Sequence, residues 1–498
     1  MMGLVLGRSR LGLGLAMPYA VLSEPAEPRS RCAADTFGLW LATSARHLNP
    51  PTSGCITGDV ATMKIVLVSM NFSPELTGVG KYSGEMADGL LARGHEVAVV
   101  CAPPYYPTWT VAPGHSGNAY RVDHPKPGLT IHRCPIWIPK RLSGLTRLLH
   151  LASFALASMP VVLKLVCWQP RVVLVVAPGF FCAPVAWLAA RLAGAKAWLH
   201  IQDFEIDAAF ELGLLKQPWL RSLAQRAERV MLRRFDTVST ISSRMLRLLA
   251  AKSVPMQKTE LLPNWVDASA LSVADGSLEL RQSLDIAPSQ IVCLFSGTIN
   301  RKQGLGVLVE AARLLISEPR IVIVICGNGE MRASLELAAR GLPNIRFADL
   351  MPAAKLGALL NMADIHLLPQ LRGAADLVMP SKLGGMLASG RPVIASATPG
   401  TEIASIVVGC GLLTEPERAD DFAQAIATLA VDEERRQRLG AAGRSYAQRV
   451  LDSQRIFDRL DVSLATLERQ PEGRWLPAFG PPRRPVFGTP GGTFDRAR

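Results

Sequence analysis

From Lys64 onward, short apolar runs alternate with amphipathic segments of helical length. The first series of runs is KIVLVSM, HEVAVVC, LTIHRC, RVVLVV, AWLHIQ and DTVSTI. After the Pro and Asn of LLPNWVD, a second series follows with IVCLFSG, RIVIVICG, NIRFAD, DIHLLP and RPVIAS. Continuous apolar runs between helices are typical of parallel strands covered on both faces. The sequence therefore predicts an α/β protein with two doubly wound, Rossmann-like domains.

The same pattern predicts where the domains begin and end. No sustained helical or strand period precedes Met63, so we expect a non-native or disordered extension before it. A secretory signal is disfavoured, because the arginines near the start of the chain follow the first apolar cluster. The Pro, Gly and Arg content of the last residues predicts a disordered tail. The expected parts are an extension (1–62), a first Rossmann-like domain (63–265), a second one (266–445), a C-terminal helix (446–469) and a tail (470–498).

Composition limits the classes of partner. A chain of 498 residues has room for two or three domains, and its formal net charge of +13 suits nucleotide diphosphates or lipid head groups. We find no zinc finger, aromatic-interleaved basic stripe or recognition helix, which argues against nucleic acid. The nine cysteines are scattered without a CxxC pair, so neither a zinc site nor a disulfide framework is implied and a reducing compartment is expected.

Residues 148–168, LLHLASFALASMPVVLKLVCW, are unusually apolar for a surface helix. Pro160 and Lys164 interrupt the segment, and the uninterrupted part is shorter than the roughly 20 residues that cross a bilayer. Two interpretations stay open, a helix in the membrane interface and a buried helix of the first domain.

A glycine loop follows the first predicted strand. In NFSPELTGVGKYSGEMADGL, Gly78 and Gly80 lie between strand and helix, where backbone N–H groups can approach an anion, although tight turns use glycine as well. The absence of GxGxxG disfavours a dehydrogenase. Glu75 in the same loop either orients the acceptor of a transfer reaction or caps the loop.

The second domain repeats this arrangement with cations added. In LFSGTINRKQGLGVLVEAARLL, Gly297 ends the strand, Arg301 and Lys302 lie in the loop, and Gly304 opens the helix. A helix terminus contributes only about 0.3 to 1 kcal/mol toward an anion, whereas a charge-assisted hydrogen bond adds about 1.5 to 3 kcal/mol. A bound diphosphate would therefore need these cations as well as the helix.

The segment GAADLVMPSKLGGMLASGRPVIASATPGTEIA contains the most specific motif, with Pro380, Ser381 and Lys382 opening a short helix. It resembles the donor-binding helix of the large family of retaining glycosyltransferases that includes many bacterial polysaccharide enzymes. Together with MKIVLVSMNFSPELTGVGKYS and IQDFEID, it is most similar to the colanic acid biosynthesis glycosyltransferases and the related amino-sugar transferases that carry a PSKL motif, here residues 380–383. The resemblance covers about residues 63–465.

The resemblance implies a GT-B fold, in which the two Rossmann-like domains face a central cleft. The second domain would hold the nucleotide-sugar donor, the first would hold the acceptor, and closure of the cleft would exclude water. It further implies retention of anomeric configuration with no metal and no cofactor beyond the nucleotide-sugar co-substrate. The leaving diphosphate would then be stabilised by fixed cations, for which Arg301, Lys302 and Lys382 are the candidates.

One feature departs from the family pattern. The family places two glutamates around this helix, and alignment on ASGRPV puts Leu377 and Gly385 at their positions. Asp376 is one position from the first and can substitute for it as a donor-binding residue. We interpret the loss as a trait of the PSKL subfamily, by analogy.

Two further catalytic candidates lie in LHIQDFEIDAAF, near the carboxyl end of a predicted strand, where open α/β sheets bind ligands. The family resemblance implies that a His or Asp in this loop faces the sugar. Asp203 is the first candidate and His200 the second, because His200 lies within the strand period and is also compatible with a core position. Lys302 completes the predicted catalytic set.

The resulting hypothesis is transfer of a hexose or deoxyhexose, with GDP-fucose as a candidate donor, to a polyprenyl-diphosphate-linked oligosaccharide. The enzyme would be cytoplasmic, would lie on the inner membrane surface and would act in exopolysaccharide assembly. A nucleotide-sugar 2-epimerase shares this fold, but the carboxylate and His arrangements typical of those enzymes are absent from the sequence. A catalytically silent donor-binding subunit is the other alternative, and the missing glutamates favour it.

Overall fold

The computed structural model describes residues 62–75, 78–140, 143–204, 218–268, 271, 276–372 and 380–469. The predicted extension and tail therefore lie outside the described residues, apart from the last residue of the extension. Asp376 also lies outside them, as does the side chain of Lys302.

The first described sheet contains eight strands in the order β3-β4-β2-β1-β5-β6-β7-β8, parallel except for β3 against β4. Its central strands are apolar and are buried at every position of β5 and β6, as expected for a sheet covered on both faces. The strands are β1 (Lys64–Ser69), β2 (Glu96–Cys101), β3 (Arg121–Lys126), β4 (Leu129–Arg133), β5 (Val172–Ala177), β6 (Lys196–Ile201), β7 (Thr237–Thr240) and β8 (Thr259–Leu261).

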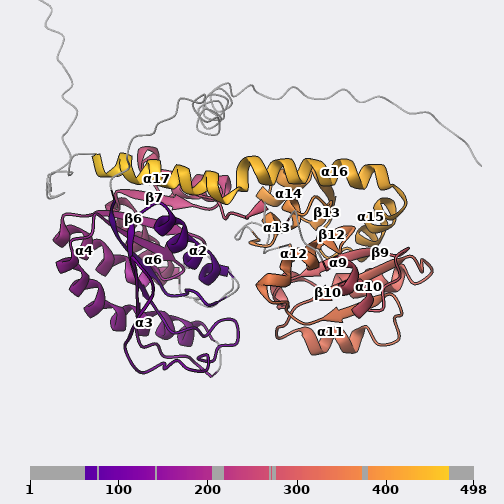
Figure 1. Cartoon of the computed structure of the whole chain (residues 1–498), viewed down its shortest axis with the longest axis horizontal. Helices are drawn as coiled ribbons and strands as arrows, with labels where there is room; N and C mark the ends of the chain where they lie inside the picture. The colour runs from indigo at the N-terminus through magenta and orange to yellow at the C-terminus, as the bar shows by residue number, and fades with distance from the viewer. Residues whose placement is uncertain are drawn as a thin grey trace, which may run out of the picture. The chain divides into compact units, whose positions relative to one another are not determined.

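Two hydrophobic clusters cover the faces of this sheet. Leu151 of α3, Ala186 of α4 and Met245 of α7 belong to one cluster. Met86 of α2 and Leu460 of α17 belong to the other, and Figure 1 shows α17 in yellow beside the first sheet. The helices are α2 (Gly78–Ala92), α3 (Gly144–Lys164), α4 (Ala183–Ala193), α6 (Pro218–Arg234), α7 (Ser243–Ala251) and α17 (Ser453–Arg469).

The second described sheet is entirely parallel, with six strands in the order β11-β10-β9-β12-β13-β14. Its strands are β9 (Ile291–Ser296), β10 (Ile321–Cys326), β11 (Ile345–Ala348), β12 (Ile365–Leu368), β13 (Val393–Ser396) and β14 (Gly411–Thr414). Its helices are α9 (Ser277–Ser283), α10 (Gly306–Leu314), α11 (Arg332–Ala338), α12 (Leu356–Asn361), α13 (Leu383–Ala388), α14 (Glu402–Val407), α15 (Ala419–Val431) and α16 (Glu433–Tyr446).

Each sheet has a point at which the strand order reverses. In the first sheet β1 lies between β2 and β5, and in the second β9 lies between β10 and β12. Ligands of open α/β sheets bind outside the carboxyl ends of the strands at such points. The two-sheet architecture confirms the predicted fold class and directs attention to the loops after β1 and β9.

Candidate functional site

The loops after β9 and β10 pack backbone against backbone at the carboxyl edge of the second sheet. The N–H of Gly297 donates to the carbonyl of Cys326 at 2.9 Å, and the N–H of Ile299 donates to that of Asn328 at 2.9 Å. Gly327 has φ +149°, and a Cβ atom there would lie 1.9 Å from the Gly297 carbonyl oxygen. Only glycine allows this approach, so the backbone around Gly297 is held in a fixed position.

Lys382 reaches this backbone from the start of α13. Its Nζ donates to Oε1 of Gln303 at 2.7 Å and lies 3.9 Å from the centre of the Phe295 ring. A Cβ atom on Gly297 would be 3.5 Å from Nζ, so the structure brings Gly297 and Lys382 together. Burial lowers the pKa of Lys382 to about 7. An ammonium group has three donors, which leaves Nζ able to bind an anion beside Gln303.

The other predicted residues of the β9 loop surround this contact. Arg301 begins a 3₁₀ helix, η4 (Arg301–Gln303), and its side chain is exposed. Gly304 follows with φ +62° and precedes α10. The backbone N–H of Arg301 donates to Oε1 of Glu330 at 3.4 Å, which ties the loop to the segment after β10.

Two side chains of this edge, Gln303 and Gln370, are not among the residues that the sequence motifs predict. Gln370 follows β12, and its Oε1 is buried without a hydrogen-bond partner among the described residues, as is Oδ1 of Asn300. A buried unpaired acceptor requires an explanation, and a donor group on a bound ligand supplies one. The sequence does contain a signal for Gln370, because a polar side chain there directly follows the apolar run HLLP.

In the first domain, Glu75 is buried and faces main-chain donors. Its carboxylate accepts from Asn71 Nδ2 at 2.9 Å and from the N–H groups of Tyr105 and Tyr106 at 3.1 and 3.0 Å. Burial raises the pKa of Glu75, and these hydrogen bonds oppose the rise. A Cβ atom on Gly80 would lie 2.6 Å from Glu75, so glycine is required there. These contacts join the loop after β1 to the loop after β2.

Helix α2 contacts the PSKL segment. The hydroxyl of Tyr82 donates to the carbonyl of Ser381 at 3.1 Å. Gly78 begins the same helix with φ +60°, and among the described residues beyond its own neighbours in the chain no atom lies within 4 Å of the position that its Cβ would occupy. The start of α2 and the segment before α13 therefore adjoin one another.

His200 lies within β6, and Asp203 follows the strand. His200 is fully buried, its Nδ1 lies 2.9 Å from the Ser239 hydroxyl, and its Nε2 is buried without a partner in the described part of the chain. Burial lowers the pKa of His200 to about 3, so the ring is neutral at physiological pH. Asp203 is half-buried at the carboxyl end of the sheet. Among the described residues, no group of three His, Cys, Asp or Glu side chains forms a metal site.

Comparison with known proteins identifies the family. The model of the glycosyl transferase 4-like domain matches residues 77–265, and that of glycosyl transferases group 1 matches residues 277–446. A protein described as a colanic acid biosynthesis glycosyl transferase, WcaI of Escherichia coli (strain K12), is 40% identical over 405 residues, which are 79% of this chain and 98% of the relative. The chain belongs to the group 1 glycosyltransferases.

Solved structures show the same fold for this group 1 glycosyltransferase. Sucrose-phosphate synthase from Thermosynechococcus elongatus has a TM-score of 0.65 at 16% identity, over 81% of this chain and 99% of that one. HepE of Anabaena, in complex with UDP-glucose, has a TM-score of 0.59 at 15% identity, over 81% and 100%. The predicted GT-B fold and the predicted relation to colanic acid enzymes are confirmed.

Proposed function

We propose that this glycosyltransferase moves a hexose or deoxyhexose from a nucleoside diphosphate sugar to a polyprenyl-diphosphate-linked oligosaccharide. The observation that carries the proposal is the partly buried Lys382 ammonium, which lies against Gln303 and Gly297 at the point where the strand order of the second sheet reverses. The donor diphosphate binds there, and GDP-fucose is a candidate donor. The product enters an exopolysaccharide similar to colanic acid.

The proposed mechanism retains the anomeric configuration and uses no metal. When the sugar–oxygen bond breaks, negative charge develops on the leaving diphosphate, and preorganised donors in a dry site stabilise it most strongly. Lys382, Arg301 and the backbone N–H groups around Gly304 supply such donors. Asp203 and His200 are proposed to face the sugar from the first domain.

A transfer assay tests the proposal. The purified chain is incubated with a panel of UDP- and GDP-sugars and a polyprenyl-diphosphate oligosaccharide, and released nucleotide is measured with and without EDTA. We expect release that survives EDTA and a product whose anomeric configuration, read by NMR, matches the donor. An epimerised donor supports the 2-epimerase instead, and saturable donor binding without turnover supports a silent subunit.

Donor binding should depend on pH through Lys382. The protonated form binds the diphosphate, and the pKa of the free enzyme's Lys382 is about 7. Below this pH the charge is already present, whereas above it binding must take up a proton, so affinity should fall by about tenfold per pH unit until the pKa of the complex is reached. Calorimetric titration between about pH 6 and pH 9 measures the slope.

The matched control is Lys382→Arg, which stays charged across this range. Its donor affinity should not follow the same slope, and proton uptake, detected with two buffers of different ionisation enthalpy, should vanish. A wild-type affinity that stays constant through pH 8 and shows no proton uptake would exclude Lys382 as the binding cation.

The membrane surface is proposed to contact helices α3, α4 and α6. By length and composition alone, residues Gly144–Trp168 are apolar enough to cross a membrane. Large apolar side chains are exposed along the three helices: Leu145, Leu149, Leu156 and Met159 on α3, Leu188 and Leu192 on α4, and Trp219, Leu223 and Val230 on α6. Helix α6 also exposes Arg221, Arg226, Arg229, Arg233 and Arg234. Apolar side chains next to arginines are typical of surfaces that lie on anionic lipid.

Leu156→Glu tests this surface. Leu156 is 68% exposed, so the substitution should leave the fold intact while placing a charge against the acyl boundary. Binding to vesicles that contain anionic lipid, measured by co-sedimentation, should fall by about tenfold. Leu337→Glu, at a position that is 60% exposed in the second domain, is the control and should change nothing. If both variants bound the vesicles equally well, α3 would not be part of the membrane-contacting surface.

A further inference from the structure

A cavity lies at the edge of the second sheet opposite to Lys382. It has a volume of about 480 Å³ and is bounded by α16 and by the segment Ser389–Pro392. Asp364 directly precedes β12, and Arg391 is separated from the start of β13 by Pro392 alone, so the cavity is at the amino ends of these strands. Lys382 and Gly297 lie at the carboxyl ends, and the cavity is therefore separate from the proposed donor site.

The wall of this cavity is preformed. A Cβ atom on Gly440 of α16 would lie 2.0 Å from the Gly390 carbonyl oxygen, so helix and turn meet backbone to backbone. Gly390 has φ +74°, and a Cβ atom there would lie 2.9 Å from the guanidinium of Arg444. Side chains on α16 are thus held in fixed positions over the turn, and a ligand would pay little to order them.

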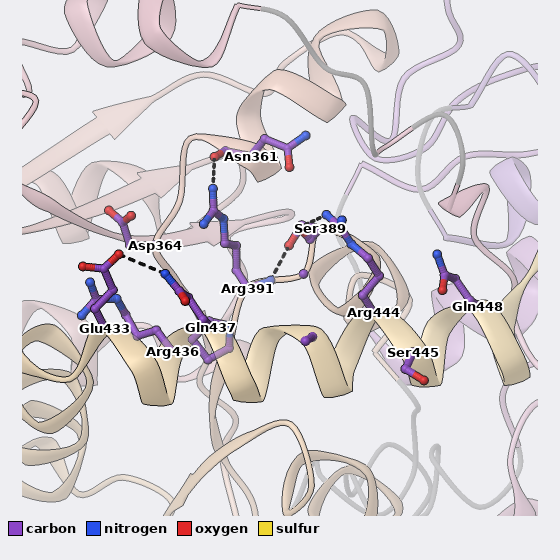
Figure 2. Close-up of a pocket in the computed structure, with 13 residues that line it drawn as sticks. Asn361, Asp364, Ser389, Arg391, Glu433, Arg436, Gln437, Arg444, Ser445 and Gln448 are labelled. Atoms are coloured by element: carbon purple, nitrogen blue, oxygen red, sulfur yellow. Dashed lines mark hydrogen bonds between the residues drawn. The ribbon is translucent and has the colours of Figure 1, made fainter.

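Three arginines line the cavity, and Figure 2 shows Arg436 and Arg444 on α16 and Arg391 on the turn. Arg444 donates to the carbonyls of Ala388 at 3.3 Å and Ser389 at 2.8 Å. Arg436 donates to two carbonyls at the end of α15, at 2.6 and 2.9 Å. These two side chains cap helix C-termini, which is a structural role.

Arg391 differs from the other two arginines. Its side chain makes a long contact, from Nη2 to the carbonyl of Asn361 at 3.4 Å, and its Nε is buried without an acceptor among the described residues. A buried guanidinium N–H without an acceptor is costly unless a ligand supplies one. Figure 2 shows Arg391 directed along the cavity between Asn361 and Ser389.

The acidic side chains of the cavity do not satisfy Arg391. Asp364 Oδ2 accepts from Arg281 at 2.8 Å and from the N–H of Val292 at 2.8 Å. Glu433 is exposed at the rim and accepts from Gln437 at 3.0 Å. The interior therefore keeps a positive charge, which favours an anion.

We propose that this cavity binds the phosphate monoester of a small hydroxylated metabolite, such as a sugar phosphate. Arg391 supplies the charge-assisted hydrogen bonds to the phosphate, a group that the planar guanidinium binds in bidentate fashion. The volume lies within the range of small-molecule sites. Gln437 and Ser445 on α16, and Gln448 just after it, line the same cavity and offer polar groups to the hydroxyls. The site is independent of the transfer function proposed above.

Two adjacent alanines on α16 allow a matched test. Ala441 lines the cavity and Ala442 does not, and both are exposed, so each accepts a glutamate without disturbing the fold. Binding of glucose 6-phosphate and of inorganic phosphate to the full chain is measured by calorimetry in the presence of saturating GDP or UDP, which occupies the donor site. Ala441→Glu and Arg391→Gln should each weaken glucose 6-phosphate binding by at least about tenfold, while Ala442→Glu should not.

The outcomes separate the possibilities. Two results together support the site. Glucose 6-phosphate binds more tightly than inorganic phosphate, and Ala441→Glu loses this binding while Ala442→Glu keeps it. Equal affinity for the two probes overturns the monoester assignment. Absence of saturable binding, or binding that Ala441→Glu and Arg391→Gln leave unchanged, overturns the site itself. Each result is independent of the transfer assay, so failure here leaves the donor proposal standing.

Discussion

Replacing Lys382 with methionine is expected to lower kcat/KM for the nucleotide sugar by about 100-fold. Methionine preserves most of the apolar stem and removes the ammonium, which lies 2.7 Å from Oε1 of Gln303 and 3.9 Å from the centre of the Phe295 ring. A lost charge-assisted contact to a diphosphate costs about 1.5 to 3 kcal/mol, and more when the charge develops in the transition state. Steady-state kinetics with varied donor measures the loss.

Two controls accompany this variant. Lys355→Met removes an exposed lysine from the same domain, and Trp187→Phe changes an indole that donates to the Arg234 carbonyl at 3.2 Å on the first domain. Both should retain nearly full activity. If Lys382→Met falls no further than these variants, the donor diphosphate is not bound at the start of α13.

Gly327→Ala should destabilise the second domain by about 3 kcal/mol or more. The new Cβ atom would lie 1.9 Å from the Gly297 carbonyl oxygen, in a backbone conformation with φ +149° that L side chains rarely adopt. Overpacking costs about 1 to 3 kcal/mol, and a strained backbone costs a similar amount. Thermal unfolding, followed by circular dichroism, measures the change, and donor affinity should fall with it because Gly297 must move.

Gly341→Ala separates the effect of a steric clash at the new Cβ atom from the effect of backbone strain at positive φ. Gly341 also has a positive φ of +84°, but in the described part of the chain, apart from its sequence neighbours, no atom lies within 4 Å of the position of its Cβ. This variant should cost only about 1 kcal/mol and leave donor affinity unchanged. Equal stability losses in the two variants would show that the close approach of the β9 and β10 loops is not maintained in solution.

Buried strands were predictable, whereas exposed edge strands were not. Runs such as IVCLFSG and RIVIVICG are apolar throughout because both faces of the second sheet are covered, and they form β9 and β10. Strand β3, RVDHPK, is almost wholly exposed, and it pairs only with β4 at the edge of its sheet. Its polar sequence carries no strand period, so tertiary pairing rather than local pattern determines it.

The C-terminal region also contains a feature that the local sequence pattern does not predict. The sequence predicts a C-terminal helix over residues 446–469, whereas in the structure this range is divided near Asp452, where residues 447–451 continue from α16 and α17 begins at Ser453. At this point Val266 pairs with Asp452, and its N–H donates to the Leu451 carbonyl at 2.8 Å. A contact between residues so distant in sequence interrupts a locally helical pattern, which no local rule can reveal.

The candidate site was partly predictable. Strand order brings the carboxyl ends of β9 and β12 together, so the proximity of Gly297 and Lys382 follows from the alternating pattern and the topology rule. The contact between Lys382 and Gln303 depends on side-chain direction within a short 3₁₀ turn, which the pattern does not encode. Two of the three hydrogen bonds of Glu75, from the N–H groups of Tyr105 and Tyr106, likewise require the loop after β2, which lies far along the chain.

A crystal structure of the chain with a nucleoside diphosphate bound tests the central claim most directly. We expect a phosphate oxygen within about 3 Å of Lys382 Nζ, next to the Gly297 backbone and facing the first domain. A diphosphate that lies elsewhere, for example against Arg391 at the amino edge of the second sheet, would contradict it.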